Sequence, residues 1–133
     1  MRRSLLLIVD DDRDTRELYS SYLAMSGYEV CDALDGREAI EKTLALQPDL
    51  IVLDLWMPKV DGWQTLKALR SDPATAATPI IVLTGHELKA YLRPAAIAMG
   101  AQSFLTKPCS PGRLGLEIET RLQASRRSQQ TAS

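Results

Sequence analysis

The chain has 133 residues, of which 45% are hydrophobic and 25% charged, and its formal net charge at pH 7 is −1. This length suits a single domain with a substantial core, and the near-neutral charge excludes a global electrostatic attraction to nucleic acid or to a membrane surface. The apolar residues after Met1 are too few for a signal peptide or a membrane span, and they end at three aspartates, so we expect a cytoplasmic protein.

The first predicted strand is the aliphatic run of residues 5–9, which ends at three consecutive aspartates. A continuous apolar run of this length is typical of a strand that is buried on both faces. A helix is predicted from about Asp14 to a stop at Gly27, with Asp12 and Asp14 as its cap and dipole partners. Three side chains at helical spacing predict its buried face: Leu18, Tyr22 and Met25.

Four further strand–helix units are predicted along the chain. Their strands are residues 28–33, 50–53, 80–83 and 103–106. Their helices begin near Asp35, Gly62, Pro94 and Ser110. The second helix of the chain is predicted to carry four apolar residues: Ala39, Ile40, Leu44 and Leu46.

The alternation of strands and helices predicts an α/β fold with a doubly wound parallel sheet and helices on both of its faces. Right-handed crossovers bring the carboxyl end of every strand to the same edge of such a sheet. The residues at those ends are Asp10, Asp11, Asp54, Thr84 and Lys107, which we therefore expect to lie close together.

This set of side chains points to phosphoryl chemistry. Three carboxylates in one cleft repel one another, and a hard divalent cation such as Mg²⁺ relieves that repulsion through oxygen ligands. Thr84 offers a hydroxyl donor and Lys107 a compact positive charge to a phosphoryl group. Asp54 then acts as the nucleophile and becomes an aspartyl phosphate.

The motifs around these residues resemble, taken together, those of one protein family. They are Ile8-Val9-Asp10-Asp11, the stretch from Leu53 to Pro58 with Asp61-Gly62, Leu83-Thr84-Gly85, and the stretch from Phe104 to Pro108. From Leu5 to about Leu122 the chain looks like a receiver domain of two-component response regulators, of the stand-alone, chemotaxis-regulator type. The resemblance implies a flavodoxin-like sheet with strand order 2-1-3-4-5 and five helices on two faces.

The resemblance also assigns roles to the clustered residues. It implies that Asp54 accepts a phosphoryl group from a histidine kinase or phosphotransfer protein, with Thr84 and Lys107 contacting that group. The implied Mg²⁺ ligands are Asp10, Asp11, Asp54 and the backbone carbonyl of Trp56. No other cofactor is implied, and such a domain is a phosphoacceptor rather than an enzyme, although it assists its own phosphorylation and dephosphorylation.

A switch to an activated state is the second implication of the resemblance. Thr84 would move toward the phosphoryl group and Phe104 would swing inward, which changes the surface of the fourth helix, fifth strand and fifth helix. A downstream protein effector would read that surface, either from a monomer or from a phosphorylation-dependent dimer. Family members usually have a cis peptide at the position of Lys107-Pro108.

Two positions depart from the family's usual pattern beside the acceptor. Trp56 is large for a position that borders the attacking water, and His86 is its counterpart across the cleft. We hypothesise that Trp56 partly shields the acyl phosphate and slows its hydrolysis. Phe104 stands where tyrosine is common and has no hydroxyl to donate.

Three alternatives compete with this interpretation. A phosphatase of the haloacid dehalogenase type would use Asp10 as the nucleophile and give Asp54 no role. Such an enzyme also requires a pair of acidic residues after the lysine, which the chain does not supply. An FMN-binding module would need a phosphate-binding first loop, whereas this loop is acidic. A receiver-like module that binds proteins without phosphorylation is the remaining alternative, and the full set of acceptor residues argues against it.

The last helix is predicted to end near Ala124. Residues 1–124 are then the receiver domain and residues 125–133 a polar tail that frays. So short a polar segment cannot form a helix-turn-helix, so we expect no DNA-binding domain in this chain. The chain is accordingly predicted to be either a stand-alone receiver or a piece of a longer protein.

Overall fold

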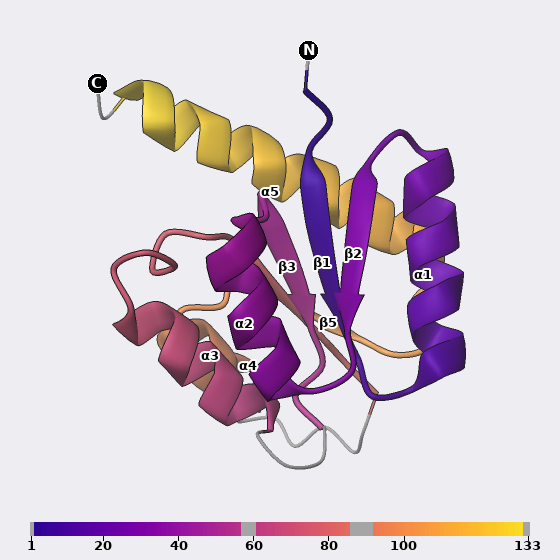
Figure 1. Ribbon diagram of the computed structural model, residues 1–133, viewed down its shortest axis with the longest axis horizontal. Helices are drawn as coiled ribbons and strands as arrows, with labels where there is room; N and C mark the ends of the chain where they lie inside the picture. Colours follow the sequence, from indigo (N-terminus) through magenta and orange to yellow (C-terminus); the bar gives the residue numbers. More distant parts are fainter. Residues whose placement is uncertain (1, 57–60, 86–91, 132–133) are drawn as a thin grey trace.

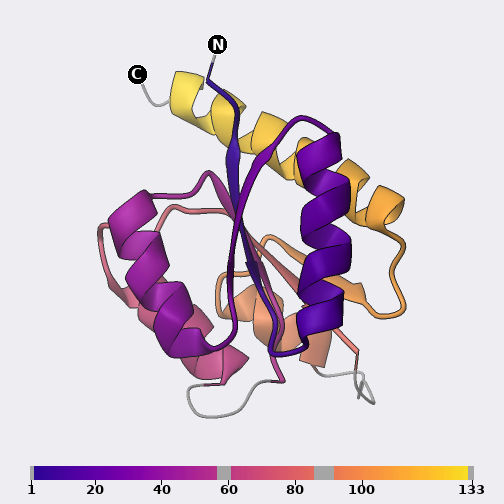
Figure 2. The same cartoon turned by 45° about the vertical axis from the view of Figure 1, so that its right-hand side comes forward.

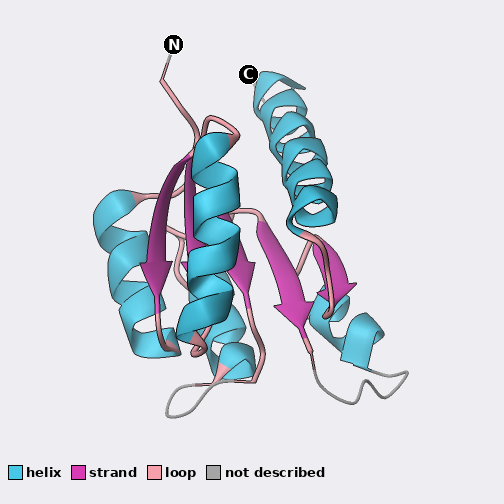
Figure 3. Ribbon diagram, turned by 90° about the vertical axis from the view of Figure 1, so that its right-hand side faces the viewer, coloured by secondary structure: helices cyan, strands magenta, loops and turns pink. Residues whose placement is uncertain are grey.

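The computed structural model describes residues 2–56, 61–85 and 92–131. Its parallel sheet contains five strands: β1 (Leu5–Val9), β2 (Glu29–Ala33), β3 (Leu50–Leu53), β4 (Ile80–Thr84) and β5 (Ser103–Thr106). The strand order is β2-β1-β3-β4-β5, and Figure 3 shows all arrows pointing the same way. The predicted flavodoxin-like order 2-1-3-4-5 is confirmed.

Helices cover both faces of the sheet. They are α1 (Arg13–Met25), α2 (Gly36–Leu46), α3 (Gly62–Ser71), α4 (Leu92–Ala98) and α5 (Pro111–Thr131). Helices α1 and α5 pack on one face, and α2, α3 and α4 pack on the other (Figures 1 and 2). None of the helices in the described ranges is both long and apolar enough to cross a membrane.

The central strand β1 shows why the aliphatic runs are uninterrupted. Leu7 and Val9 contribute to the core beneath α2, α3 and α4, whereas Leu6 and Ile8 contribute to the core beneath α1 and α5. All four are at most 1% exposed. Successive side chains point to opposite faces of a strand, so a strand covered on both sides needs apolar residues at every position.

Aspartates cap the start of three helices, and the cap predicted at Asp12 is confirmed. The side chain of Asp12 accepts the N–H of Thr15 at the start of α1, as the sequence predicted. Asp35 caps α2 in the same way, and Asp61 forms a reciprocal capping box with Gln64 at the start of α3. Each cap lies shortly after a strand, where the chain leaves the core and begins a helix.

The predicted buried face of α1 is wrong. Leu18, Tyr22 and Met25 are 56%, 41% and 90% exposed, and the buried side chains are Tyr19 and Leu23. Both sets fit the periodicity of a helix, because they lie on neighbouring stripes of its surface. The docking of α1 against α5 and β2 selected between the stripes, and that contact is not visible in local sequence.

Helix α2 contains the four apolar residues predicted for it, but they are not equally buried. Ala39 is buried, whereas Leu44 and Leu46 are 44% and 48% exposed, and Thr43 is buried. The Thr43 hydroxyl donates to the Ala39 carbonyl within the helix, so its polar group is satisfied in the core. A threonine can therefore occupy a core position of a helix.

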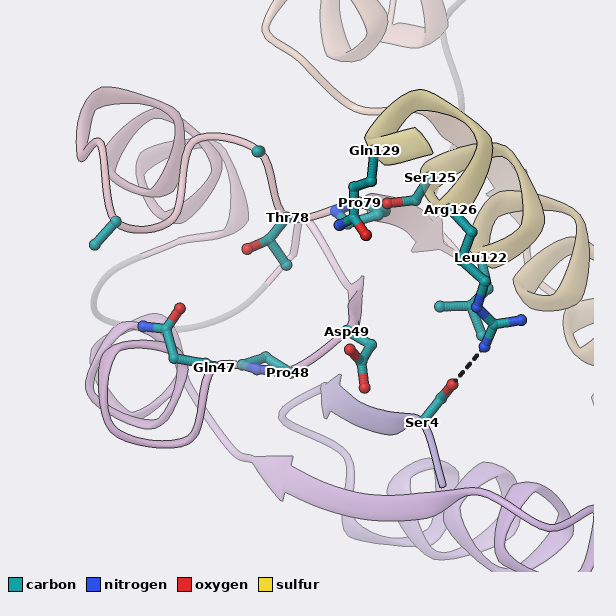
Figure 4. Close-up of a pocket in the computed structure, with 12 residues that line it drawn as sticks. Ser4, Gln47, Pro48, Asp49, Thr78, Pro79, Leu122, Ser125, Arg126 and Gln129 are labelled. Carbon is teal, nitrogen blue, oxygen red and sulfur yellow. Dashed lines mark hydrogen bonds between the residues drawn. The ribbon is translucent and has the colours of Figure 1, made fainter. Parts of the chain in front are cut away.

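The predicted end of the last helix near Ala124 is also wrong, because α5 continues through polar residues to Thr131. This extension overhangs the amino-terminal edge of the sheet and walls a hollow there together with Pro48, Thr78 and Pro79 (Figures 1 and 4). The Arg126 guanidinium donates to the Ser4 hydroxyl across 2.9 Å. The division of the chain into a domain of residues 1–124 and a separate tail stays a prediction.

The two stripes of α1 lead to a prediction with a matched control. We expect Leu23→Ala to lower the free energy of unfolding by about 2–5 kcal/mol, because it leaves a cavity in the core. Leu18→Ala, on the same helix, should change it by less than about 0.5 kcal/mol because Leu18 is exposed. Urea unfolding of both variants measures the difference, and equal losses would contradict the burial of α1 described here.

Candidate functional site

The carboxyl-terminal edge of the sheet gathers the residues that the sequence predicted. Asp10 follows β1, Asp54 follows β3, Thr84 ends β4 and Lys107 follows β5. The backbone N–H of Asp54 donates to the Val9 carbonyl at 3.0 Å, which extends the β1–β3 ladder to the acidic residue. The sheet itself therefore places the Asp54 side chain at the centre of this edge.

Three carboxylates form a cluster at this point. Asp10, Asp11 and Asp54 each offer an oxygen, and these oxygens all lie within 4.8 Å of one another. Asp10 and Asp54 are buried, whereas Asp11 is exposed. Buried carboxylates at this separation repel one another strongly unless a cation lies between them.

Lys107 supplies a cation to this cluster. Its Nζ lies 2.6 Å from Oδ2 of Asp10 and 3.3 Å from Oδ2 of Asp54. Its aliphatic stem runs past Gly85, where a Cβ atom would come within 3.0 Å of the Lys107 Cδ. Gly85 thus leaves the space through which the lysine reaches the two carboxylates.

The second oxygen of Asp54 is held by two donors. Oδ1 accepts the Thr84 hydroxyl at 3.1 Å and the backbone N–H of Trp56 at 3.0 Å. Thr84 is fully buried, so its hydroxyl is aimed at the carboxylate from inside the protein. With Lys107 beside Oδ2, both oxygens of Asp54 are held by donors or by a positive charge.

Burial and charge act in opposite directions on the acid and the base of this site. Burial raises the pKa of Asp54, and the Trp56 N–H and the positive charge of Lys107 offset that effect only in part. Burial by itself lowers the pKa of Lys107. The hydrogen bond to Asp10 and the negative charges of Asp54 and Asp10 outweigh burial, so the pKa of Lys107 is raised and the amine stays protonated.

The aromatic residues near the site differ in exposure. Trp56 is 49% exposed and lines the same hollow as Asp12, Gly85 and Pro108. Phe104 is 4% exposed and lies in the core beneath α2, α3 and α4, so in this structure its ring is already inward. The prediction for His86 falls on residues outside the described ranges.

Two residues that support the site were not among the predicted ones. The Arg16 guanidinium donates to the Asp10 carbonyl at 2.8 Å, and the Tyr19 hydroxyl donates to the Cys109 carbonyl at 2.6 Å. No local sequence signal marks either residue. Gly62, which belongs to one of the motifs, also packs against the site: a Cβ there would lie 2.3 Å from the Asp54 carbonyl oxygen.

Comparison with known families and proteins gives a consistent result. The sequence model of the response regulator receiver domain matches residues 6–119. The DNA-binding dual master transcriptional regulator RpaA of Synechocystis sp. is 37% identical over 96% of this chain and 52% of its own length. The transcriptional regulatory protein CpxR of Escherichia coli K12 is 40% identical over 94% of this chain and 52% of its own length. The chain therefore spans about half the length of these relatives.

Solved structures show the same fold. The chemotaxis protein CheY4 of Vibrio cholerae has a TM-score of 0.82 and 35% identity, over 91% of this chain and 99% of that one. The signal receiver domain of a LuxO-type repressor protein from Vibrio parahaemolyticus has a TM-score of 0.90 and 27% identity, over 99% of both chains. Both are about as long as this chain, and the match therefore covers a complete receiver fold.

The close packing of Gly62 against Asp54 leads to a prediction. Gly62→Ala should destabilise the protein by about 1–3 kcal/mol, because the new methyl group meets the backbone of Asp54 and Leu55 at 2.3 Å. Gly115→Ala, in α5, is the control. Its Cβ would lie 3.5 Å from Tyr22 of α1, which is ordinary van der Waals contact, so the change should be neutral or mildly stabilising. Thermal unfolding compares the two, and a neutral Gly62→Ala would contradict the packing.

Proposed function

The chain belongs to the response regulator receiver domain family, and on that premise we propose that Asp54 accepts a phosphoryl group from a histidine kinase or phosphotransfer protein. The observation that carries the proposal is the arrangement around Asp54. Its two oxygens are oriented by Thr84, Trp56 and Lys107, and two further carboxylates lie beside it. That is the pre-organisation that in-line phosphoryl transfer requires.

The donor set of this edge fits Mg²⁺. Asp10, Asp11 and Asp54 offer hard oxygen ligands, and Asp11 is open to solvent, which suits a cation that keeps several waters. We propose that these three carboxylates hold the ion with the backbone carbonyl of Trp56. When bound, Mg²⁺ would neutralise the charge of the carboxylates and of the phosphoryl oxygens.

The chain's own residues then carry the transfer. An oxygen of Asp54 forms the bond to phosphorus while the bond to the donor's nitrogen breaks and that nitrogen leaves with the electron pair. Lys107 stays protonated and faces the incoming charge. Thr84 exchanges its hydrogen bond from Oδ1 of Asp54 to a phosphoryl oxygen, because phosphorylation alters the carboxylate that it contacts here.

The proposed output is a change of surface. Movement of Thr84, with adjustment of Phe104 in the adjoining strand β5, would alter the face formed by α4, β5 and α5, which a downstream protein effector then reads. The proposal includes a cytoplasmic location and a monomer or phosphorylation-dependent dimer. RpaA is named as a DNA-binding protein, but the chain spans about half its length, and we propose no direct DNA contact for the described residues.

The first test asks which residue is modified. Incubation with acetyl phosphate and Mg²⁺ should phosphorylate Asp54, as located by mass spectrometry, and chelation of the metal should reduce the rate steeply because the acidic cluster is then uncompensated. Asp54→Asn should abolish the modification because the nucleophile is lost. Modification of Asp10 instead, or none at all in the wild type, would overturn the proposal.

The second test concerns the lifetime of the phosphorylated state. Trp56→Asn should accelerate loss of the phosphoryl group by roughly two- to fivefold, because a smaller side chain at the mouth of the hollow admits water more freely. Trp63→Phe is the control and should leave the rate unchanged, because Trp63 is partly buried against the core beneath α2, α3 and α4 and does not line this hollow. Radiolabel loss measures both, and an unchanged rate for Trp56→Asn would refute the shielding role.

A further inference from the structure

The segment that carries Lys107 is attached to a helix far away in the sequence. The Tyr19 hydroxyl of α1 donates to the backbone carbonyl of Cys109 at 2.6 Å, across a separation of 90 residues. Cys109 lies in the connection between β5 and α5, directly after the cis Lys107-Pro108 peptide. The contact therefore joins α1 to the segment from which the lysine of the site projects.

The Tyr19 side chain is part of the hydrophobic core. It is 4% exposed and packs with Leu23, Leu114 and Ile118 between α1 and α5. Burial raises the pKa of the Tyr19 hydroxyl, so the group stays protonated and able to donate. A buried hydroxyl without a partner is costly, and the Cys109 carbonyl is the partner that this one has.

The segment is held on either side of Pro108. Before it, the Lys107 N–H donates to the Thr84 carbonyl at 3.0 Å. Pro108 itself has no N–H to contribute. After it, the Cys109 carbonyl accepts the Tyr19 hydroxyl, and the Ser110 side chain caps α5 by accepting the Arg113 N–H. The contact with Tyr19 thus defines where the segment crosses from the sheet to the helix.

We propose that Tyr19 is a positioning residue for phosphoryl transfer, because its hydroxyl holds the Cys109 carbonyl and thereby keeps the Lys107 ammonium beside Asp10 and Asp54. The inference rests on the function proposed above and deepens it. Lys107 is the group that acts, and Tyr19 acts only through it. The proposed Mg²⁺ ligands follow β1 and β3 and are not carried by the segment that Tyr19 contacts, so loss of the Tyr19 hydroxyl should not weaken Mg²⁺ binding.

The test uses substitutions that remove a single oxygen atom. Tyr19→Phe should lower the rate of phosphorylation by acetyl phosphate, at saturating Mg²⁺, by about three- to tenfold, the factor that loss of one hydrogen bond typically gives. It should not weaken Mg²⁺ binding, followed by Trp56 fluorescence. Tyr22→Phe is the matched control, on the next turn of α1 and 41% exposed, and should change neither quantity.

A double-mutant cycle shows whether Tyr19 acts through Lys107. Lys107→Ala alone should lower the rate of phosphorylation. Adding Tyr19→Phe to this variant should lower the rate no further, because the side chain that Tyr19 positions is absent. An equal loss in both backgrounds would mean a general structural role and would overturn the proposal. So would a Tyr19→Phe variant that reacts at the wild-type rate, or one that weakens Mg²⁺ binding as much as it slows phosphorylation.

The same experiment distinguishes an error in the proposed function from an error in the role of Tyr19. If the wild-type protein acquires no phosphoryl group on Asp54, the function proposed above is refuted, and the role of Tyr19 in it is refuted as well. If the wild type and Tyr22→Phe react normally and Tyr19→Phe does too, only the role of Tyr19 is refuted. The wild-type rate therefore separates the two outcomes.

Discussion

The ion pairs of Lys107 with Asp10 and Asp54 are the interaction on which the site depends. Two buried carboxylates repel each other at this distance unless a cation compensates them. The lysine relieves that repulsion at 2.6 and 3.3 Å and is itself held protonated by it. The carboxylates still outnumber it, which leaves a deficit of positive charge that a divalent cation would fill.

Helix α1 is the element that fixes this arrangement from outside the sheet. Arg16 donates to the carbonyl of Asp10, and Tyr19, about one helical turn later, donates to the carbonyl of Cys109. Both residues bind backbone carbonyls. They therefore restrict the segments that carry Asp10 and Lys107 without contacting the charged side chains of these two residues. The segments after β1 and β5, which carry the two partners of the Asp10–Lys107 ion pair, are thus both hydrogen-bonded to the same helix.

The two edges of the sheet are used in different ways. At the carboxyl-terminal edge, charged groups converge and are left partly compensated. At the amino-terminal edge, the extension of α5 walls a second hollow (Figure 4). There, Asp49 pairs with Arg2 at 3.0 Å and accepts the Leu5 N–H, and Arg126 donates to Ser4. Among the described residues, the group of three carboxylates that could hold a metal ion lies at the first edge.

The sequence by itself determined the layers of the fold and the members of the site. Short aliphatic runs such as residues 50–53, which lie between two prolines, are typical of strands covered on both faces. A parallel sheet brings the carboxyl ends of its strands together, so strand positions alone predicted that Asp54 and Lys107 lie close to each other. These inferences rest on periodicity and chain direction, which are local properties.

Only the tertiary structure decided which stripe of α1 is buried, how far α5 extends and what Tyr19 contacts. Leu18 and Leu23 are equally suited to a core by composition, and the packing of α5 against α1 selects Leu23. The partner of the Tyr19 hydroxyl is a backbone carbonyl 90 residues away, which has no signature in any residue type. Contacts of this kind depend on how distant elements dock, and local sequence carries no record of that geometry.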